Sequence, residues 1–327
     1  MASVSCGRTA CWIAIVLMAW SLAANVAATQ EWPTAQPIRV IAPTTPGSTA
    51  DLMARIVFQQ VGAQLGQAVV VENRSGAGTT TGMNAVAKSA PDGYTLLVNS
   101  TSYVVVASTY AKLPYDPYDD MIGVALLAQF PVVVASSLKY KTLAKLVAAG
   151  QMKPSPLTFG TLGLGSSGHL ATARLMRAAN FAGTHVPFRG TSEAMTELIA
   201  GRLDMYSGVV PNASDLARAG EINVLGIATV KRSPLFPDVP TTIEAGFPDS
   251  DYNFWMGSYM PAKTPRAIVE RLNAEVQNAL QDETVRSRIS QLGGEVETMS
   301  VDQFNAFIDK ERNSNAEIVK LIGYKPQ

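Results

Sequence analysis

The sequence has little cysteine, little histidine and no excess charge of either sign. Its 327 residues include 2 cysteines and 2 histidines, and 26 basic residues balance 26 acidic ones. Two histidines with no cysteine near them form no recognisable set of metal ligands. The balanced charge provides no basic patch for nucleic acid or for an anionic membrane surface. We therefore expect neither a metal nor a nucleic-acid partner.

Both cysteines, Cys6 and Cys11, lie in a segment typical of a secretory signal peptide. Arg8 precedes the apolar run ACWIAIVLMAWSLAA, and the small residues of NVAATQ follow it. A membrane anchor is the alternative, but the run is shorter than the ~20 apolar residues that a spanning helix needs. We expect residues 1–28 to be removed near Thr29, which leaves a periplasmic protein without thiols or disulfides.

The rest of the chain alternates short apolar strands with amphipathic helices, which predicts an α/β fold with mostly parallel sheets. The first helix is expected over 51–65, with a buried face. The residues of that face are Leu52, Ile56, Val57, Val61 and Leu65. Near the C-terminus, a second buried stripe comprises Ile268, Leu272, Val276 and Leu280, and Ser300 with Gln303 resembles a capping box.

Two segments indicate crossings between two lobes. VALLAQFPVVVAS is too long for one ordinary strand and is broken by Pro131, and a return crossing is expected near DYNFWMGSYMP. We expect lobe 1 to comprise residues 37–129 and 243–327, and lobe 2 to comprise 130–242.

The stretch LTFGTLGLGSSGHLATARLM fits the glycine spacing of a dinucleotide-binding turn. That motif also needs an acidic residue about 20 positions later to hold the ribose, and no Asp or Glu lies between Gly168 and Glu193. We therefore expect no nicotinamide cofactor, and none of another kind. A glycine-rich turn at a helix N-terminus can still bind an anion, because glycine leaves room for backbone amides to approach it.

Several strand-to-helix junctions share this design, with small and hydroxylated residues between an apolar strand and a helix. In open parallel sheets, ligands bind beyond the carboxyl ends of the strands, where these junctions lie. Two lobes of this kind facing each other would clamp an anion. The residues expected to contact the ligand are Thr44, Thr45, Gly47, Ser48, Thr49, Asn99, Ser100, Gly163, Gly165, Ser166, Ser167, His169, Arg189, Gly190, Thr191, Pro211 and Asn212.

Some side chains admit two interpretations. We expect Asp51 to cap its helix rather than to contact the ligand. Arg189 is either a bidentate partner for a carboxylate or a solvated loop residue, and Trp255 is either a core aromatic or a stacking platform. Ser166 or Ser167 beside His169 suggests a secreted hydrolase, but the motif of a nucleophile elbow is absent.

Five segments together resemble the extracytoplasmic receptors of tripartite tricarboxylate transporters, the Bug-type proteins. They are PIRVIAPTTPGSTADLMAR, LGQAVVVENRSGAGTTTGMNAVAKSAPDGYTLL, LTFGTLGLGSSGHLA, HVPFRGTSEAMTELIAGRLDM and RSPLFPDVPTTIEAGFPD. The chain departs from the usual family pattern at Thr44, Thr45 and Ser48 in the first loop and at Ser75. The ligand of other members therefore does not transfer to this chain.

The resemblance implies a two-lobed Venus-flytrap receptor that holds a small carboxylate through backbone amides, loop hydroxyls and water. It also implies delivery to a membrane permease by a receptor that is not an enzyme and that we expect to be a monomer. A sensor subunit for a membrane kinase would need the same closure. Dicarboxylates, tricarboxylates, acidic amino acids and aromatic acids all stay open as ligands.

Overall fold

The computed structural model describes residues 32–152, 154, 157–163, 165–188, 190–209, 211–252, 254–321 and 323–326. The expected signal peptide at 1–28, its cleavage near Thr29 and the candidate residue Arg189 lie outside these ranges.

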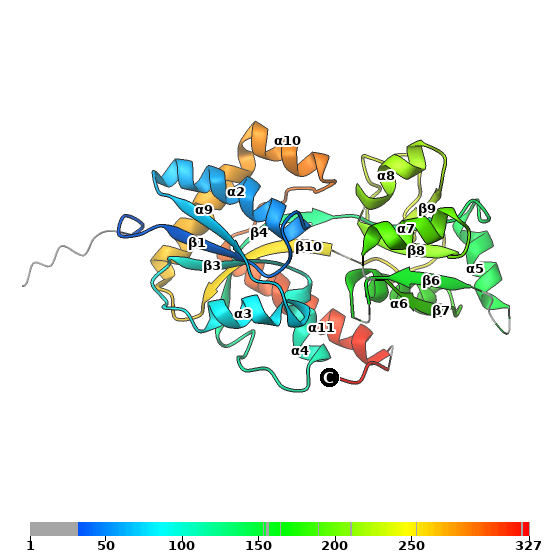
Figure 1. Ribbon diagram of the computed structural model, residues 1–327, viewed down its shortest axis with the longest axis horizontal. Coiled ribbons are helices and arrows are strands. Elements are labelled where there is room, and N and C mark those ends of the chain that lie inside the picture. The colour runs from blue at the N-terminus through cyan, green and yellow to red at the C-terminus, as the bar shows by residue number, and fades with distance from the viewer. Residues whose placement is uncertain are drawn as a thin grey trace, which may run out of the picture.

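Two five-stranded sheets form the centres of two lobes that lie side by side (Figure 1). In spatial order, the first sheet contains β2 (Val69–Asn73), β1 (Ile38–Ala42), β3 (Thr95–Ser100), β10 (Phe254–Pro261) and β4 (Met121–Phe130). The second contains β7 (Thr184–Pro187), β6 (Thr158–Thr161), β8 (Met205–Val209), β5 (Val132–Ser136) and β9 (Asn223–Ile227).

One strand in each sheet runs opposite to the other four. β10 pairs antiparallel with β3 and β4, and β5 pairs antiparallel with β8 and β9, whereas β1 and β6 pair in parallel with their neighbours. Each reversed strand is the one that has just arrived from the other lobe. Pro131 separates β4 from β5, so the predicted crossing and the predicted fold of two mostly parallel sheets are confirmed.

Helices cover both faces of each sheet, so each lobe has three layers (Figure 1). On the first sheet, one face carries α2 (Thr49–Leu65), α9 (Arg266–Gln281) and α10 (Glu283–Gln291), and the other carries α3 (Thr80–Ala87), α4 (Ser102–Thr109) and α11 (Val301–Leu321). A 3-10 turn, η1 (Ala77–Thr79), precedes α3. On the second sheet, one face carries α7 (Thr191–Ile199) and α8 (Pro211–Arg218), and the other carries α5 (Leu143–Gln151) and α6 (Ser167–Ala178).

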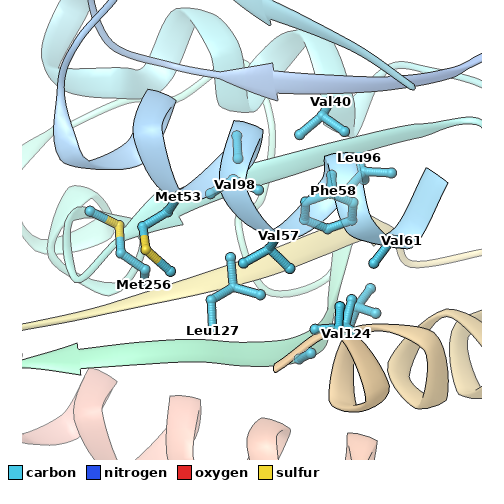
Figure 2. Close-up of a cluster of buried hydrophobic side chains, with 14 of the residues drawn as sticks. Val40, Met53, Val57, Phe58, Val61, Leu96, Val98, Val124, Leu127 and Met256 are labelled. Atoms are coloured by element: carbon cyan, nitrogen blue, oxygen red, sulfur yellow. The ribbon is translucent and has the colours of Figure 1, made fainter. Parts of the chain in front are cut away.

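Helix α2 anchors the largest core of the first lobe (Figure 2). Met53, Val57, Phe58 and Val61 are completely buried against the strands, and each such side chain contributes about 1.5–3 kcal/mol of burial free energy. The buried face of α2 differs in part from the predicted one. Leu52 and Leu65 are only half-buried, whereas Met53 and Phe58, which were not predicted, are fully buried. The strand side of this cluster includes Val40, Leu96, Val98, Val124, Leu127 and Met256.

The C-terminal helices follow their sequence signals closely. Leu272, Val276 and Leu280 of α9 are buried as predicted, but Ile268 is half-buried and Val269 takes its place. The capping box of α11 is confirmed, because the Gln303 amide donates to Ser300 Oγ and the Ser300 amide donates to Gln303 Oε1.

The return from the second lobe to the first lies after Phe247. Ala245 and Phe247 pack against the core of the second lobe, and the Tyr252 amide donates to the carbonyl of Ala228 at 2.9 Å. The division of the chain at residue 243 stays a proposal, and this packing places the crossing a few residues later. The described part of the chain contains no helix long and apolar enough to cross a bilayer.

Candidate ligand-binding site

A cavity of about 430 Å³ lies between the lobes, at the carboxyl ends of β1, β3, β6 and β8. Lobe 1 contributes Thr44, Gly47, Ser48, Thr49, Ala50, Ser100, Phe254 and Met256. Lobe 2 contributes Leu162, Ser166, Ser167, Gly168, Thr191, Tyr206, Ser207, Gly208 and Val209. A cavity of this volume, shared by two lobes, is typical of a site for a small molecule.

The first wall is the N-terminus of α2. Ser48 is the N-cap, and its hydroxyl accepts a hydrogen bond from the Asp51 amide and lies 2.5 Å from the hydroxyl of Thr44. The hydrogen bonds of this turn leave the amides of Thr49 and Ala50 without an acceptor among the described residues. Two backbone donors therefore face the cavity at the positive end of the helix dipole.

Asp51 supports this wall from behind. Its carboxylate accepts hydrogen bonds from the Gly47 amide, from Asn73 and from Arg55, all between 2.9 and 3.0 Å. Burial acts to raise the pKa of Asp51, but the hydrogen bonds from Arg55, Gly47 and Asn73 outweigh burial and hold the pKa below its ordinary value. The side chain is a structural cap, as expected, and the Gly47 amide donates to it rather than to the cavity.

The opposite wall is the N-terminus of α6. Ser166 is the N-cap, and its hydroxyl accepts from the His169 amide and donates to the carbonyl of Gly163. The amides of Ser167 and Gly168 have no acceptor among the residues that the structure describes. A second pair of backbone donors thus reaches the same cavity from the other lobe.

The three glycines of this junction differ in what their amides and their missing side chains contact. Gly163 and Gly165 have φ angles of 109° and 75°, and their amides donate to Thr161 Oγ1 and to His169 Nδ1. They shape the turn, but neither amide is free for an anion. Gly168 also allows close packing of α6, since a Cβ there would lie 2.3 Å from the carbonyl oxygen of Ser207.

The cavity offers dipoles rather than charges. None of its described lining residues has a charged side chain, and two helix N-termini, which carry partial positive charge, lie at its walls. Apolar side chains from Leu162, Val209, Phe254 and Met256 complete the walls. The arrangement suits an anion with a small apolar body.

Eight predicted contact residues line the cavity, and six do not. Those that line it are Thr44, Gly47, Ser48, Thr49, Ser100, Ser166, Ser167 and Thr191. Those that do not line it are Thr45, Asn99, Gly163, Gly165, His169 and Gly190. Pro211 and Asn212 begin α8 after β8. Whether any of these residues contacts a ligand stays a prediction.

Asn99 shows how a residue behind the cavity supports one on its wall. Its side chain is fully buried, and its Oδ1 accepts from the Ser100 amide and from the Ser102 hydroxyl at 2.8 and 2.9 Å.

Three residues of the cavity wall were not predicted from the sequence. They are Phe254, Met256 and Tyr206, which lie within strands rather than at junctions. Side chains alternate between the two faces of a strand, and this alternation along β10 and β8 was the sequence signal that could have identified them.

The serine and histidine at this junction do not form a catalytic pair. Ser166 Oγ donates to a carbonyl, and Nδ1 of His169 accepts from the Gly165 amide, so the imidazole does not contact the hydroxyl. A nucleophile and its base need a direct hydrogen bond.

Trp255 is fully buried and donates from Nε1 to Glu311 at 3.2 Å, so it is a core aromatic and not a stacking platform. The described residues contain no cluster of His, Cys, Asp and Glu that could hold a metal.

Comparison with known sequences gives a consistent result. The profile of the family described as "Tripartite tricarboxylate transporter family receptor" matches residues 53–324. A UPF0065 protein from the tcbD-tcbE intergenic region of Pseudomonas sp. strain P51 is 39% identical over 79% of this chain and 78% of its own. Protein BugT of Bordetella pertussis is 33% identical over 89% of this chain and 90% of its own.

Solved structures give the same result. The periplasmic binding protein BugD has a TM-score of 0.77 at 27% identity and covers 90% of this chain and 99% of its own. MatC (Rpa3494) of Rhodopseudomonas palustris, with bound malate, has a TM-score of 0.76 at 32% identity, covering 88% and 99%. Rpa4515 of R. palustris, with adipate, has a TM-score of 0.80 at 29% identity, covering 91% and 100%.

Proposed function

Because the chain belongs to the tripartite tricarboxylate transporter receptor family, we propose that it is a periplasmic receptor for a small dicarboxylate, which it delivers to a membrane permease. Members of this family are receptors and not enzymes, and the Ser166 geometry agrees with that.

One observation carries the choice of ligand: two helix N-termini, one from each lobe, face one cavity. Each terminus is equivalent to about half a positive charge and offers two amides that have no acceptor among the described residues. A dianion with one carboxylate on Thr49 and Ala50 and the other on Ser167 and Gly168 would use both and would hold the lobes together. Malate and adipate, bound by two proteins of similar structure, each carry two carboxylates on a short chain.

Proline substitution at the first position of each helix tests this assignment. Thr49→Pro and Ser167→Pro each remove one amide, while proline at this position suits a helix and the extended N-cap before it. We expect each variant to keep its stability and to lose about 10-fold to 100-fold in affinity for malate or adipate, measured by calorimetry.

Two controls separate the amide from other effects. Ser167→Ala removes only a hydroxyl, and Thr49→Ala removes a hydroxyl and a methyl group. Both variants keep the backbone amide, and both are expected to lose less affinity than the proline variants. Glu283→Pro occupies the same position of α10, which does not line the cavity, and should bind normally. If both cavity proline variants bind as the wild type does, the helix termini are not the carboxylate sites.

A further inference from the structure

His169 is placed to control the α6 junction without lining the cavity. It lies in the first turn of α6 and is only 6% exposed. Its Nδ1 accepts a hydrogen bond of 3.1 Å from the Gly165 amide. The imidazole therefore connects the start of the helix to the loop that precedes it.

A second imidazole extends this connection. The His185 ring stacks on the His169 ring with centroids 4.7 Å apart, and Phe159 stacks near both. Nε2 of His185 lies 2.6 Å from the hydroxyl of Thr161, and this hydroxyl also contacts the amide and the carbonyl of Gly163 at 3.1 Å. The two stacked imidazoles thus fix the loop at two points: His185 acts on Gly163 through Thr161, and His169 bonds Gly165 directly.

The Gly165 bond requires a neutral imidazole with its proton on Nε2, because only an unprotonated Nδ1 can accept. Burial, together with the charge that His185 would carry, lowers the pKa of His169 to about 4. His185 on β7 is the titratable group that faces His169, and the other stacked ring, Phe159 on β6, is uncharged. Neutral pH therefore keeps the acceptor available.

The loop also meets the other lobe. A Cβ on Gly165 would lie 3.3 Å from Cγ2 of Thr109, the last residue of α4 in lobe 1. A shift of this loop would alter both the donors at the start of α6 and the contact between the lobes.

We propose that His169 is a positioning residue for ligand capture, which holds the Gly165 amide and so fixes the loop that presents the Ser167 and Gly168 amides to the cavity. This inference rests on the proposed function, since it assigns those amides to a carboxylate.

Three substitutions at this position distinguish positioning from simple packing. His169→Asn places an oxygen where Nδ1 lies, His169→Gln places one nearer the site of Nε2, and His169→Leu provides no acceptor. Calorimetry with malate and with adipate should show the Asn variant within about threefold of the wild type, and the Gln and Leu variants weakened about tenfold. Thermal unfolding identifies any variant that fails to fold. Equal affinities for the folded Asn and Leu variants would overturn the proposal.

A pH series gives a second readout that packing alone would not move. The ratio of wild-type to His169→Asn affinity cancels the ionisation of the ligand, and it should fall as the pH approaches 4, because protonation removes the imidazole acceptor. A ratio that stays constant from about pH 7 to about pH 4 would contradict the mechanism.

Nitrogen-15 NMR of the ligand-free protein tests the tautomer independently of any ligand. We expect His169 to carry its proton on Nε2 and the Gly165 amide to be protected from exchange; a proton on Nδ1 would overturn the proposal. A wild type that binds no dicarboxylate but shows the expected tautomer would instead reject the proposed function.

Discussion

Gly168 of α6 packs directly against the backbone of Ser207 in β8. A Cβ would come within 2.3 Å of a backbone carbonyl, which cannot rotate away, so the helix itself would have to move. We expect Gly168→Ala to lose about 1–3 kcal/mol of unfolding free energy and to weaken ligand binding. Gly190→Ala is the matched control, because its Cβ would meet nothing within 4 Å and its φ of -162° is extended. Urea denaturation compares the two, and equal stabilities would contradict the packing argument.

Asp51 makes the folding stability of the first lobe depend on pH. Its folded pKa lies below the unfolded value near 3.8, so its ionised form stabilises the fold above that pH. This contribution is lost as the pH falls through the folded pKa. We expect Asp51→Asn to lose unfolding free energy at neutral pH, and the difference from the wild type to shrink below about pH 4. A constant difference across a series of urea titrations would show that ionisation is irrelevant.

Between elements, a buried carboxyl group joins α11 to β10. Glu311 of α11 is buried and accepts one hydrogen bond from Trp255 of β10. Burial raises the pKa of Glu311 above its ordinary value, although the Trp255 bond opposes this. A raised carboxyl pKa means that folding stability falls as the pH rises above the unfolded value.

Glu311→Gln keeps an acceptor for Trp255 and removes the charge. We therefore expect it to raise the melting temperature at neutral pH and to change it little near about pH 4. Glu317→Gln, at an exposed position on the same helix, should have no such pattern. A Glu311→Gln variant that is less stable than the wild type at neutral pH would indicate that Glu311 has an ionic partner that compensates for its burial.

Most elements were predictable because their signals are local. The capping box at Ser300 and the break at Pro131 each depend on residues close in sequence. Helix α4 was not predicted, because Tyr103, Val104, Val105 and Val106 are all buried and the run has no helical period. Its conformation depends on packing beneath α11, which local sequence does not reveal.

The candidate site was predictable only in part for the same reason. Hydroxyls and glycines before a helix mark a junction, and eight of those predicted lie on the cavity wall. Tyr206, Phe254 and Met256 join them only because of the order of strands in each sheet. The sequence also cannot show which amides are already bonded, as those of Gly47 and Gly165 are.

For the whole molecule, the ligand should connect the lobes. Two strand connections and the contact of α6 with α11 join them, so a dicarboxylate bound at both helix termini favours the closed arrangement. Small-angle scattering should give a smaller radius of gyration with ligand than without. Added stability should reach about 2.7 kcal/mol at roughly 100-fold excess over the dissociation constant. An unchanged radius at saturation would contradict closure.

The position of β10 between β3 and β4 has a consequence for the order of assembly. A chain that emerges from its N-terminus has every strand of the second sheet once Ile227 is free, but the first sheet has a gap until Pro261 follows. Strands β3 and β4 then have no partner at their facing edges. The lobe that starts first is thus completed last, and the two halves of the cavity meet only after about four-fifths of the chain has emerged.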